Sequence, residues 1–331
     1  MRIAIISDSW LPLTNGVVTT LTTVIRMLEA RGHAVLVIHP RLFPTIPCPS
    51  YPEIKLALST PRALADRLDE FAPEAIHLMI EGPLGLVGRY YCDRRRLPFT
   101  TSYTTKFPEY IRARYPVPVG ATYLALRWFH RGAARTTVAA ASLKRELEAR
   151  GFRNLVYWSR GVDVDLFKPG GKNAMDYPRP IYLYAGRVAV EKNLEAFLDL
   201  KLPGSKVVIG DGPALPAMKR RYPEVHFLGW QRQQDLARYM AAADVFVFPS
   251  LMDTFGVVML EAMACGVPVA AYPVPGPRDV VVHGETGWLD SDLQKAAAKA
   301  LALEAKRCRA HAMNYTWEKS VDQFESILIK I

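Results

Sequence analysis

Two acidic side chains interrupt an otherwise apolar segment, PSLMDTFGVVMLEAMACGVPVAA, at residues 249–271. Asp253 falls in an expected loop, and Glu261 falls about a turn and a half into an expected helix that ends at Gly266. A carboxylate between apolar neighbours can accept both hydroxyls of a vicinal diol such as a ribose, and one in the loop can accept sugar hydroxyls. The alternative is structural: Asp253 would cap the helix, and Glu261 would lie on its solvent-facing side.

The beginning of the same helix offers a second kind of chemistry. The first N–H groups of a helix have no partner within it, and they bind phosphate or sugar oxygens. Here they belong to the stretch from Phe255 through Gly256 to Val257. Gly16 opens another expected helix after the first strand, in SDSWLPLTNGVVTTL, and it predicts either a similar anion site or a structural glycine turn.

Two basic residues flank a further expected helix start, in YAGRVAVEKNLEAFL. Arg187 lies at the end of a predicted strand, and Lys192 lies in the first turn of the predicted helix. A cation at a helix N-terminus opposes the helix dipole by about 0.3–1 kcal/mol, so an anion between the two side chains is the expected reason for them. A planar guanidinium together with a compact ammonium suits a diphosphate.

A glycine pair and a tryptophan follow the next two predicted strands. GDGP contains Gly210 and Gly212 and begins like a dinucleotide fingerprint, but Leu215 stands where the third glycine would be, so the match is weak. The two glycines predict instead a turn that lets a ligand approach the backbone closely. Trp230, in FLGWQ, could pack on a nucleotide base, and a core tryptophan is the alternative.

Composition sets limits on the class of protein. The chain has 331 residues, of which 50% are hydrophobic and 22% are charged, which is ordinary for globular proteins and fits two domains of about 150 residues. No apolar run reaches the roughly 18 residues that span a bilayer, and MRIAIISDSW has no signal-peptide pattern. The four cysteines form no C-x-x-C pair, which argues against a zinc site or a disulfide framework. We therefore expect a cytoplasmic protein.

The net charge of +10 is unevenly distributed, since residues 89–160 hold 15 Lys or Arg against 4 Asp or Glu. Such a region can attract anionic lipid by about 1 kcal/mol per basic side chain near a membrane surface. It could equally attract nucleic acid or form a solvated face without a partner. The arginines expected on an acceptor or membrane surface are Arg94, Arg95, Arg96, Arg112, Arg114, Arg127 and Arg131. The aromatic residues that could reach a membrane interface, or else belong to the core, are Tyr115, Tyr123, Trp128 and Phe129.

Short β-branched runs alternate with amphipathic stretches along the whole chain. RIAIISD, AVLVIHP and AIHLMIE are typical of strands, and PIYLYAG, SKVVIGDG and DVFVFPS repeat the pattern in the second half. Near-continuous apolar strands separated by helices predict parallel sheets that are covered on both faces. Pro, Gly and Asn cluster at 165–180, which predicts a linker there between two doubly wound α/β domains. Ligands of such sheets bind beyond the carboxyl ends of the strands, and those ends can face one another across a cleft.

Taken in order, the motifs GRVAVEKN, VVIGDGP, HFLGW, ADVFVFPS and DTFGVVMLEAMACGVPV resemble those of the family-4 retaining glycosyltransferases of the GT-B fold. SRGVDVDLFKP and DSWLPLTNGVV extend the resemblance to nearly the whole chain. It implies two Rossmann-like domains: an acceptor-binding domain at 1–165, joined by a returning helix at 313–331, and a sugar-nucleotide-binding domain at 166–312. DTFG, EGPLGLVGRYY and TSYTTKFPEYIRARYP resemble a sub-branch of diacylglycerol glycosyltransferases, sulfoquinovosyl-diacylglycerol synthases and α-mannosyltransferases.

The resemblance implies a role for each matching position. Arg187 and Lys192 would clamp the donor diphosphate and stabilise the leaving group, and Glu261 would bind the donor ribose. Asp253, where the family more often has Glu, would hold hydroxyls of the transferred sugar, and the backbone from Phe255 to Val258 would contact the phosphates. Retaining transfer by front-face attack lets the leaving diphosphate take the acceptor proton, so no glycosidase-type carboxylate pair is needed.

Two further features bear on the chemistry. Thr104 stands where relatives carry a histidine over the donor sugar, which leaves donor choice and the level of activity open. His130 is near in sequence and would be either structural or a replacement for that histidine. D-x-D is spelled at 163–165 and at 290–292, but the first belongs to the domain junction and the second to a late loop. We therefore expect no metal and no other cofactor.

The resemblance thus implies a retaining hexosyltransferase, which we expect to need no metal. Its donor would be of the UDP-glucose or UDP-glucuronate type or GDP-mannose, and its acceptor a lipid, diacylglycerol foremost, reached by peripheral association with the inner face of the plasma membrane. Alternatives are a soluble or polyprenyl-linked glycan acceptor, a sugar-nucleotide epimerase, an inactive sugar-nucleotide binder, or a basic nucleic-acid-binding protein. The last would show salt-dependent DNA affinity but would have no use for Glu261 or the Arg187–Lys192 pair, so no nucleic-acid partner is expected.

Overall fold

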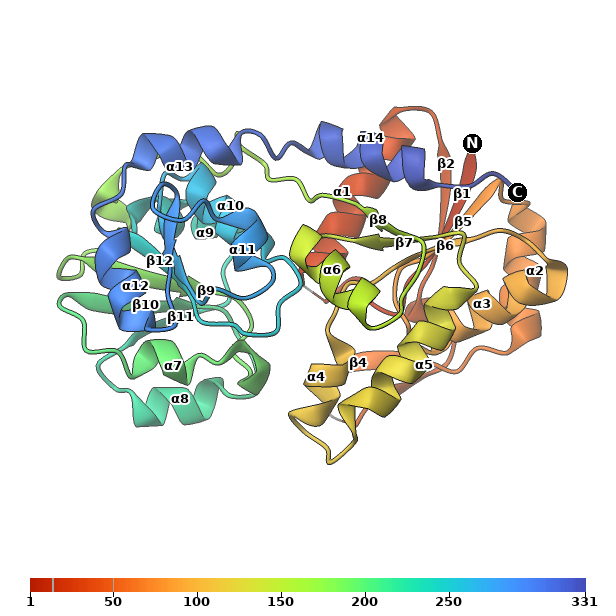
Figure 1. Cartoon of the computed structure of the whole chain (residues 1–331), viewed down its shortest axis with the longest axis horizontal. Helices are drawn as coiled ribbons and strands as arrows, with labels where there is room; N and C mark the ends of the chain where they lie inside the picture. Colours follow the sequence, from red (N-terminus) through yellow and green to blue (C-terminus); the bar gives the residue numbers. More distant parts are fainter. Residues whose placement is uncertain (14, 50) are drawn as a thin grey trace. The chain divides into compact units, whose positions relative to one another are not determined.

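The computed structural model describes residues 1–13, 15–49 and 51–331. The chain divides into two compact units, seen in Figure 1. Unit 1 comprises Met1–Ser159 together with Trp317–Ile331, and unit 2 comprises Arg160–Thr316. The predicted boundary lay a few residues later, after residue 165, and the predicted returning segment began at residue 313.

Unit 1 is built on a six-stranded sheet in which every pairing is parallel. In sheet order the strands are β2 (Ala34–Ile38), β1 (Arg2–Ile6), β5 (Ala75–Leu78), β6 (Thr100–Ser102), β7 (Arg135–Val138) and β8 (Leu155–Tyr157). Outside this sheet, β3 (Thr45–Cys48) and β4 (Tyr51–Ala57) form an antiparallel pair, so the strand-like run EIKLAL does not join the parallel sheet. The order reverses direction beside β1, which places a ligand-binding crevice at its carboxyl end.

Helices cover both faces of this sheet because alternate residues of a strand point to opposite sides. The helices of unit 1 are α1 (Gly16–Ala30), η1 (Pro40–Leu42), α2 (Pro61–Phe71), α3 (Pro83–Arg95), α4 (Phe107–Arg112), α5 (Val119–Arg131), α6 (Ala141–Ala149) and α14 (Trp317–Ile327). Ile3 and Ile5 of β1 belong to an apolar cluster that includes α1 and α14. Ala4 and Ile6 belong to a second cluster, which includes α2, α3 and α5.

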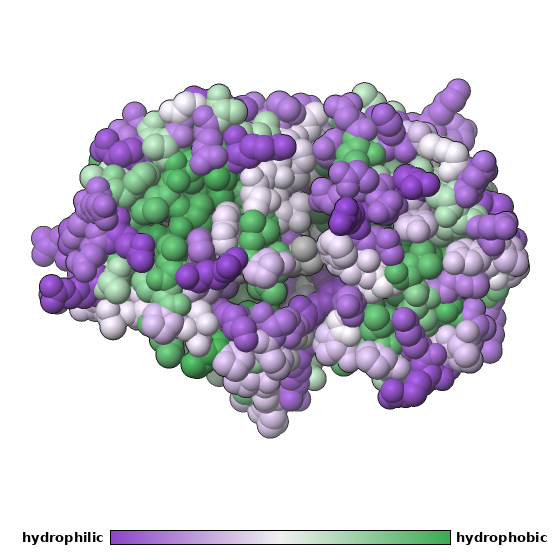
Figure 2. Space-filling model, turned by 180° about the vertical axis from the view of Figure 1, so that it is seen from behind, coloured by the Kyte–Doolittle hydropathy of each residue, from purple (hydrophilic) through white to green (hydrophobic). Residues whose placement is uncertain are grey.

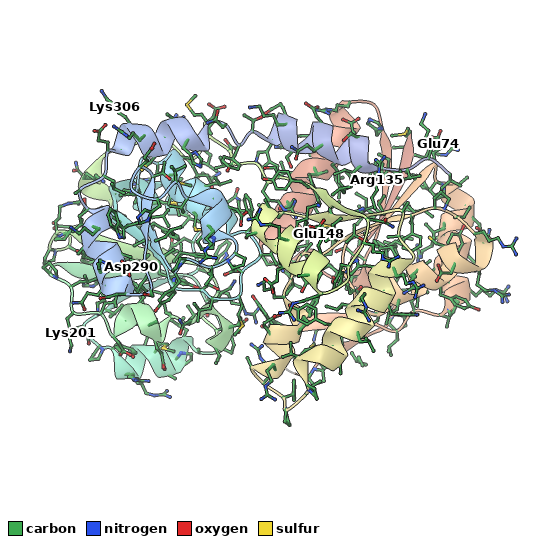
Figure 3. All side chains as sticks on the ribbon, viewed as in Figure 1. Glu74, Arg135, Glu148, Lys201, Asp290 and Lys306 are labelled. Carbon is green, nitrogen blue, oxygen red and sulfur yellow. The ribbon has the colours of Figure 1, made fainter. Side chains whose placement is uncertain are left out.

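The C-terminal segment is part of the core of unit 1, and Figure 1 shows α14 running beside α1. Trp158 donates its indole N–H to the carbonyl of Ser320 at 3.0 Å. Arg135, labelled in Figure 3, donates to the carbonyl of Ser326 at 2.6 Å. Glu74, labelled in the same view, accepts through its carbonyl from the backbone N–H of Ile331 at 2.9 Å. The end of the chain is therefore bound to unit 1 by side-chain and backbone hydrogen bonds.

Unit 2 repeats the architecture with a second all-parallel sheet. Its strands, in sheet order, are β11 (His226–Gly229), β10 (Ser205–Ile209), β9 (Ile181–Ala185), β12 (Val245–Phe248), β13 (Val269–Ala271) and β14 (Gly287–Leu289). Its helices are η2 (Lys172–Ala174), η3 (Val190–Lys192), α7 (Glu195–Leu198), α8 (Leu215–Arg221), α9 (Gln233–Ala242), α10 (Val257–Ala264), α11 (Pro277–Val280), α12 (Leu293–Ala300) and α13 (Ala305–Ala312). The strand order reverses between β9 and β12, so the crevice of this sheet lies at their carboxyl ends.

The surface mixes apolar and polar side chains. Figure 2 shows hydrophobic patches bordered by hydrophilic side chains on the face that it displays. Among the described helices, none combines the length and the apolar composition that crossing a bilayer requires. The two predicted doubly wound domains are confirmed as two parallel-sheet units.

Candidate functional site

The crevice of unit 2 brings together residues that are about 60 positions apart in the chain. Lys192 follows β9, and Asp253 follows β12, the neighbouring strand. The Lys192 Nζ lies 2.6 Å from the Asp253 Oδ1, and the two side chains are 20% and 18% exposed. Arg187, at the end of β9, is half-buried, and its carbonyl accepts from the Tyr184 hydroxyl at 2.8 Å. These residues therefore lie at the carboxyl edge of the sheet, where the strand-end rule expects ligands to bind.

The local structure around Lys192 differs from the prediction. Lys192 ends the 3-10 turn η3, and α7 begins only at Glu195, so Lys192 is not in the first turn of an α-helix. Asn193 follows in the left-handed region at φ 53°, a conformation that Asn tolerates better than most residues. Its side-chain amide donates to the carbonyl of Pro249 at 3.1 Å. Asn193 therefore connects the turn that carries Lys192 to the loop that carries Asp253. The sequence reasoning missed this residue, although an Asn directly after a turn is a signal that could have indicated its role.

Asp253 does not cap a helix, so the structural alternative for this residue is wrong. The N-cap of α10 is Gly256, and among the described residues no side chain caps that end. Asp253 uses Oδ1 for Lys192, whereas its Oδ2 is buried and has no hydrogen-bond partner within the described ranges. A buried acceptor oxygen without a hydrogen bond destabilises the folded protein, and a ligand that donates to this oxygen removes the cost. The loop therefore presents one carboxylate oxygen that a ligand hydroxyl can satisfy.

Glu261 is half-buried on α10, so it does not lie on a fully solvent-exposed side of the helix as that alternative required. Its neighbours Leu260 and Ala262 are fully buried, and burial raises the pKa of Glu261 from its ordinary 4.5 to about 7. Among the described residues, none forms a hydrogen bond or an ion pair with its carboxylate. A diol that donates two hydrogen bonds would stabilise the ionised form, which the apolar surroundings disfavour.

The beginning of α10 lies in the same loop as Asp253. Gly256 has φ 86°, a left-handed backbone conformation that favours glycine, and a Cβ there would lie 2.7 Å from the flexible end of the Met259 side chain. With no side-chain cap on this end, the first N–H groups of the helix, those of Val257 and Val258, remain available to a ligand within the part that the structure describes. The side chain of Phe255 is buried, so only its backbone can contribute.

The two GDGP glycines have a structural reason that does not involve a ligand. A Cβ on Gly210 would lie 1.9 Å from the carbonyl oxygen of Gly186, and one on Gly212 would lie 2.3 Å from that of Val188. The turn therefore packs its backbone against the loop that carries Arg187. Trp230 is 55% exposed beyond β11, so the alternative of a core tryptophan is wrong.

Gly16 differs from these glycines. It opens α1, whose N-cap Asn15 accepts from the N–H of Val18 at 2.9 Å. A Cβ on Gly16 would meet no described atom within 4 Å. Packing therefore does not require glycine at position 16. The absence of a side chain leaves open space beside the N-terminus of α1.

The seven arginines predicted for an acceptor or membrane surface lie on, or just after, α3, α4 and α5. The exposed members are Arg94, Arg95, Arg96, Arg112, Arg127 and Arg131, and Arg114 is half-buried. The four aromatic residues divide into two pairs: Tyr115 and Trp128 are 44% and 57% exposed, whereas Tyr123 and Phe129 are 5% and 2% exposed. Helical periodicity explains the division, because adjacent positions such as 128 and 129 face different sides of α5.

His130 is enclosed within unit 1 and does not reach its surface. Its Nδ1 lies 2.9 Å from the Thr101 hydroxyl, and its Nε2 lies 2.9 Å from the Glu81 carboxylate. The side chains of His130 and Glu81 are 2% and 1% exposed. Glu81, which the sequence reasoning did not single out, lies three residues after the end of β5, and this position beyond a strand end was its signal. Thr104 lies after β6 and is half-buried.

A second acid of unit 1 was also missed. Asp8 follows β1 and accepts from the N–H groups of Leu84 and Gly85 at 2.9 and 3.0 Å, which caps α3. Burial raises its pKa to about 6. Gly82 is required for this approach, because a Cβ there would lie 2.3 Å from the Asp8 Cγ. The glycine of the EGP motif therefore serves the helix cap.

The carboxylates of both D-x-D spellings have local structural partners. Asp163 accepts from the N–H groups of Asp165 and Leu166 at 3.1 and 2.9 Å. Asp290 pairs with Lys295 at 2.7 Å, and Asp292 caps α12. Within the described ranges, no group of three or more His, Cys, Asp or Glu side chains is arranged to hold a metal ion.

Comparison with known proteins agrees with this geometry. Residues 14–166 match the family model described as Glycosyltransferase Family 4, and residues 179–305 match the model described as Glycosyl transferases group 1. The chain is 32% identical to a GDP-mannose-dependent alpha-mannosyltransferase of Mycobacterium tuberculosis, over 87% of this chain and 83% of the relative. It is 28% identical to a sulfoquinovosyl transferase of Arabidopsis thaliana, over 85% and 61%. It is 23% identical to an alpha-monoglucosyldiacylglycerol synthase of Streptococcus pneumoniae, over 91% and 78%.

Solved structures share the fold. A sucrose-phosphate synthase from Thermosynechococcus elongatus superposes with a TM-score of 0.82 at 21% identity, covering 98% of this chain and 97% of that one. Anabaena HepE in complex with UDP superposes with a TM-score of 0.72 at 18% identity, covering 98% and 99%. The strand-end site of unit 2, the two parallel sheets and the similarity over most of the chain lead to one conclusion: the chain belongs to the family-4 glycosyltransferases of the GT-B fold, which take sugar nucleotides as donors.

Proposed function

We propose that this protein transfers a hexosyl group, with retention of configuration and without a metal ion, from a sugar nucleotide to a lipid, diacylglycerol foremost. The observation that carries the donor half of the proposal is the group at the carboxyl edge of β9 and β12. There Lys192, the partnerless oxygen of Asp253 and the uncapped beginning of α10 occur together. They supply a cation, a hydroxyl acceptor and N–H donors, which are the three kinds of group that a glycosyl diphosphate needs.

Each donor fragment has a partner of matching chemistry in unit 2. The diphosphate is assigned to Arg187, Lys192 and the first N–H groups of α10, and the ribose diol is assigned to Glu261. The transferred sugar is assigned to Asp253, whose Oδ2 lacks a donor among the described residues while Oδ1 holds Lys192. Trp230, exposed beyond the edge strand β11, offers a surface on which a base could stack.

The proposed step needs little acid–base chemistry from the protein. The bond between the anomeric carbon and the diphosphate oxygen breaks while the acceptor hydroxyl attacks from the same face, and the departing diphosphate oxygen takes the hydroxyl proton. Positive charge from Arg187, Lys192 and the helix terminus stabilises the leaving group, which is transition-state stabilisation by preorganised charge. An α-linked product is also what the names of the mannosyltransferase and diacylglycerol relatives indicate for those proteins.

The acceptor half of the proposal is based on the α4–α5 surface of unit 1. Leu124 and Trp128 of α5 are 60% and 57% exposed, and Tyr115 and Val117, before that helix, are 44% and 37% exposed. Exposed arginines also occur on α3, α4 and α5. Apolar side chains together with basic ones suit an anionic bilayer surface, where the apolar groups insert and the cations meet lipid phosphates. At the cytoplasmic face of the plasma membrane, a peripheral enzyme has access both to anionic lipid in the bilayer and to soluble nucleotide sugars.

The first experiment measures radiolabelled product from UDP-glucose, UDP-glucuronate, UDP-galactose and GDP-mannose, each offered with diacylglycerol in anionic vesicles. The test variant is Arg187→Ala with Lys192→Ala, and the matched control is Lys201→Ala, an exposed lysine of unit 2 labelled in Figure 3. A labelled glycolipid that persists in the control and with EDTA, but disappears in the double variant, supports the proposal. Nucleotide binding without lipid labelling from any donor refutes the lipid acceptor and favours a soluble glycan acceptor.

A second experiment tests the membrane surface separately. Leu124→Ser with Trp128→Ser should reduce cosedimentation with anionic vesicles at least tenfold while nucleotide binding stays unchanged, because both side chains are largely exposed. The thermal unfolding temperature should fall only slightly, through the loss of the Trp128 ring on which the Arg89 guanidinium stacks at 3.7 Å. Binding to vesicles that is insensitive to these changes would contradict the assignment of this surface.

A further inference from the structure

A cavity of about 460 Å³ lies in unit 2, away from the candidate donor site. Pro180 precedes β9, Asp244 precedes β12 and Pro268 precedes β13, and all three residues line the cavity. The cavity therefore opens at the amino ends of these parallel strands, whereas the donor site lies at their carboxyl ends. Its volume falls within the range of about 300–1,000 Å³ that is usual for small-molecule sites.

The charges on one wall of this cavity do not balance. Arg179 donates to the Asp244 Oδ1 at 2.5 Å, and the Asp244 Oδ2 accepts from the N–H of Ile181 at 2.7 Å, so both oxygens of the only acid in the lining are engaged. Lys172 donates to the carbonyl of Ala243, and its Nζ lies 3.9 Å from the Asp244 Oδ1. Two cations thus share one carboxylate, which leaves an excess of one positive charge.

The environment of Lys172 agrees with this imbalance. Burial lowers the pKa of its ammonium group, which means that the nearby carboxylate does not fully offset the loss of hydration. An anion placed in the cavity would supply the missing negative charge.

Part of the cavity lining is apolar. Leu301 and Leu303, from the connection between α12 and α13, form this part together with Ala305 at the beginning of α13. Leu301 is 39% exposed, so part of this apolar side chain is accessible at the cavity. Burial of an alkyl chain against it would contribute about 0.8 kcal/mol per methylene group.

We propose that this cavity binds a small anion that carries a short alkyl chain, with its head group at Lys172 and Arg179 and its chain against Leu301 and Leu303. A fatty carboxylate and an alkyl phosphate share this chemistry. Because the cavity lies at the edge of the sheet opposite the donor site, the ligand and the sugar nucleotide bind without competing. This inference does not depend on the proposed acceptor or donor.

The test measures the thermal unfolding temperature of the full chain with acetate, butyrate, hexanoate and octanoate at constant ionic strength, below micelle formation. Butyl and octyl phosphate distinguish the two head groups, and octanamide is the neutral control. We expect the unfolding temperature to rise with chain length for the anions only, by about 3–6 °C at ten times the dissociation constant. Binding of UDP and GDP should be the same with and without octanoate.

Three variants assign the effect to the cavity. Lys172→Gln should abolish the rise, Leu301→Ser should remove its dependence on chain length, and Lys201→Gln should behave like the natural chain. Lys172 and Leu301 have exposed side-chain surface, so each variant should unfold without ligand at the natural temperature. An equal rise in Lys172→Gln, a rise with octanamide, or no rise in the natural chain overturns the proposal.

Discussion

Replacing Glu261 by Gln should make the protein more stable at alkaline pH and poorer at binding nucleotide. Burial raises the pKa of Glu261 from 4.5 to about 7, so the folded protein holds this proton more tightly than the unfolded chain does. Between these two pH values the unfolded state releases the proton first, and stability falls as the pH rises. The full loss above pH 7 amounts to about 3 kcal/mol, at 1.36 kcal/mol per pKa unit.

Glutamine has nearly the same shape as protonated glutamate but cannot ionise. The free energy of unfolding of Glu261→Gln should therefore equal that of the natural chain near pH 4.5 and exceed it by up to about 3 kcal/mol at pH 8. Urea unfolding, followed by tryptophan fluorescence at pH 4.5, 6 and 8 without nucleotide, measures this difference. The same variant should bind UDP or GDP about 10–100-fold more weakly, because hydrogen bonds to a charged group contribute about 1.5–3 kcal/mol.

The two readouts can refute different parts of the reasoning. If the difference in stability between the natural chain and the variant is the same at every pH, Glu261 ionises as an ordinary surface acid. The surroundings of its carboxylate then do not raise its pKa. If the stability changes as expected but nucleotide affinity does not, the assignment of the ribose to Glu261 is wrong.

Three further predictions concern single residues. Gly210→Ala should lower the free energy of unfolding by about 3 kcal/mol, because a Cβ there would lie 1.9 Å from a carbonyl oxygen. Gly16→Ala should leave the free energy of unfolding nearly unchanged and impair only ligand binding. Chemical denaturation measures the effect on stability, and turnover measures the effect on function. Asp253→Asn breaks the ion pair with Lys192, so turnover should fall at least tenfold while affinity for the nucleoside diphosphate stays equal or rises; unchanged turnover would argue against a role in holding the sugar. Arg135→Ala should cost about 1–2 kcal/mol in urea unfolding, because it removes donors from carbonyls at the end of α14.

Much of the fold could be predicted from local pattern. Alternation of apolar strands with amphipathic helices requires parallel sheets covered on both faces, and both units have them. The same rule places strand ends at one edge, so Lys192 and Asp253 could be predicted to lie near each other before any distance was known. The antiparallel pair of β3 and β4 could not, because a single strand-like run does not reveal which partner it will have.

The sequence by itself determined the fold class, the family and the short motifs at the strand ends, because each depends on residue types within one local segment. Tertiary structure decided the rest. Only the tertiary structure shows that position 210 must be glycine because a neighbouring backbone packs against it. It also shows that Trp128 is exposed and Phe129 buried, and that the Glu81 carboxylate contacts His130. These outcomes depend on atoms that are distant in the chain, and packing and desolvation act on the neighbours that folding brings together.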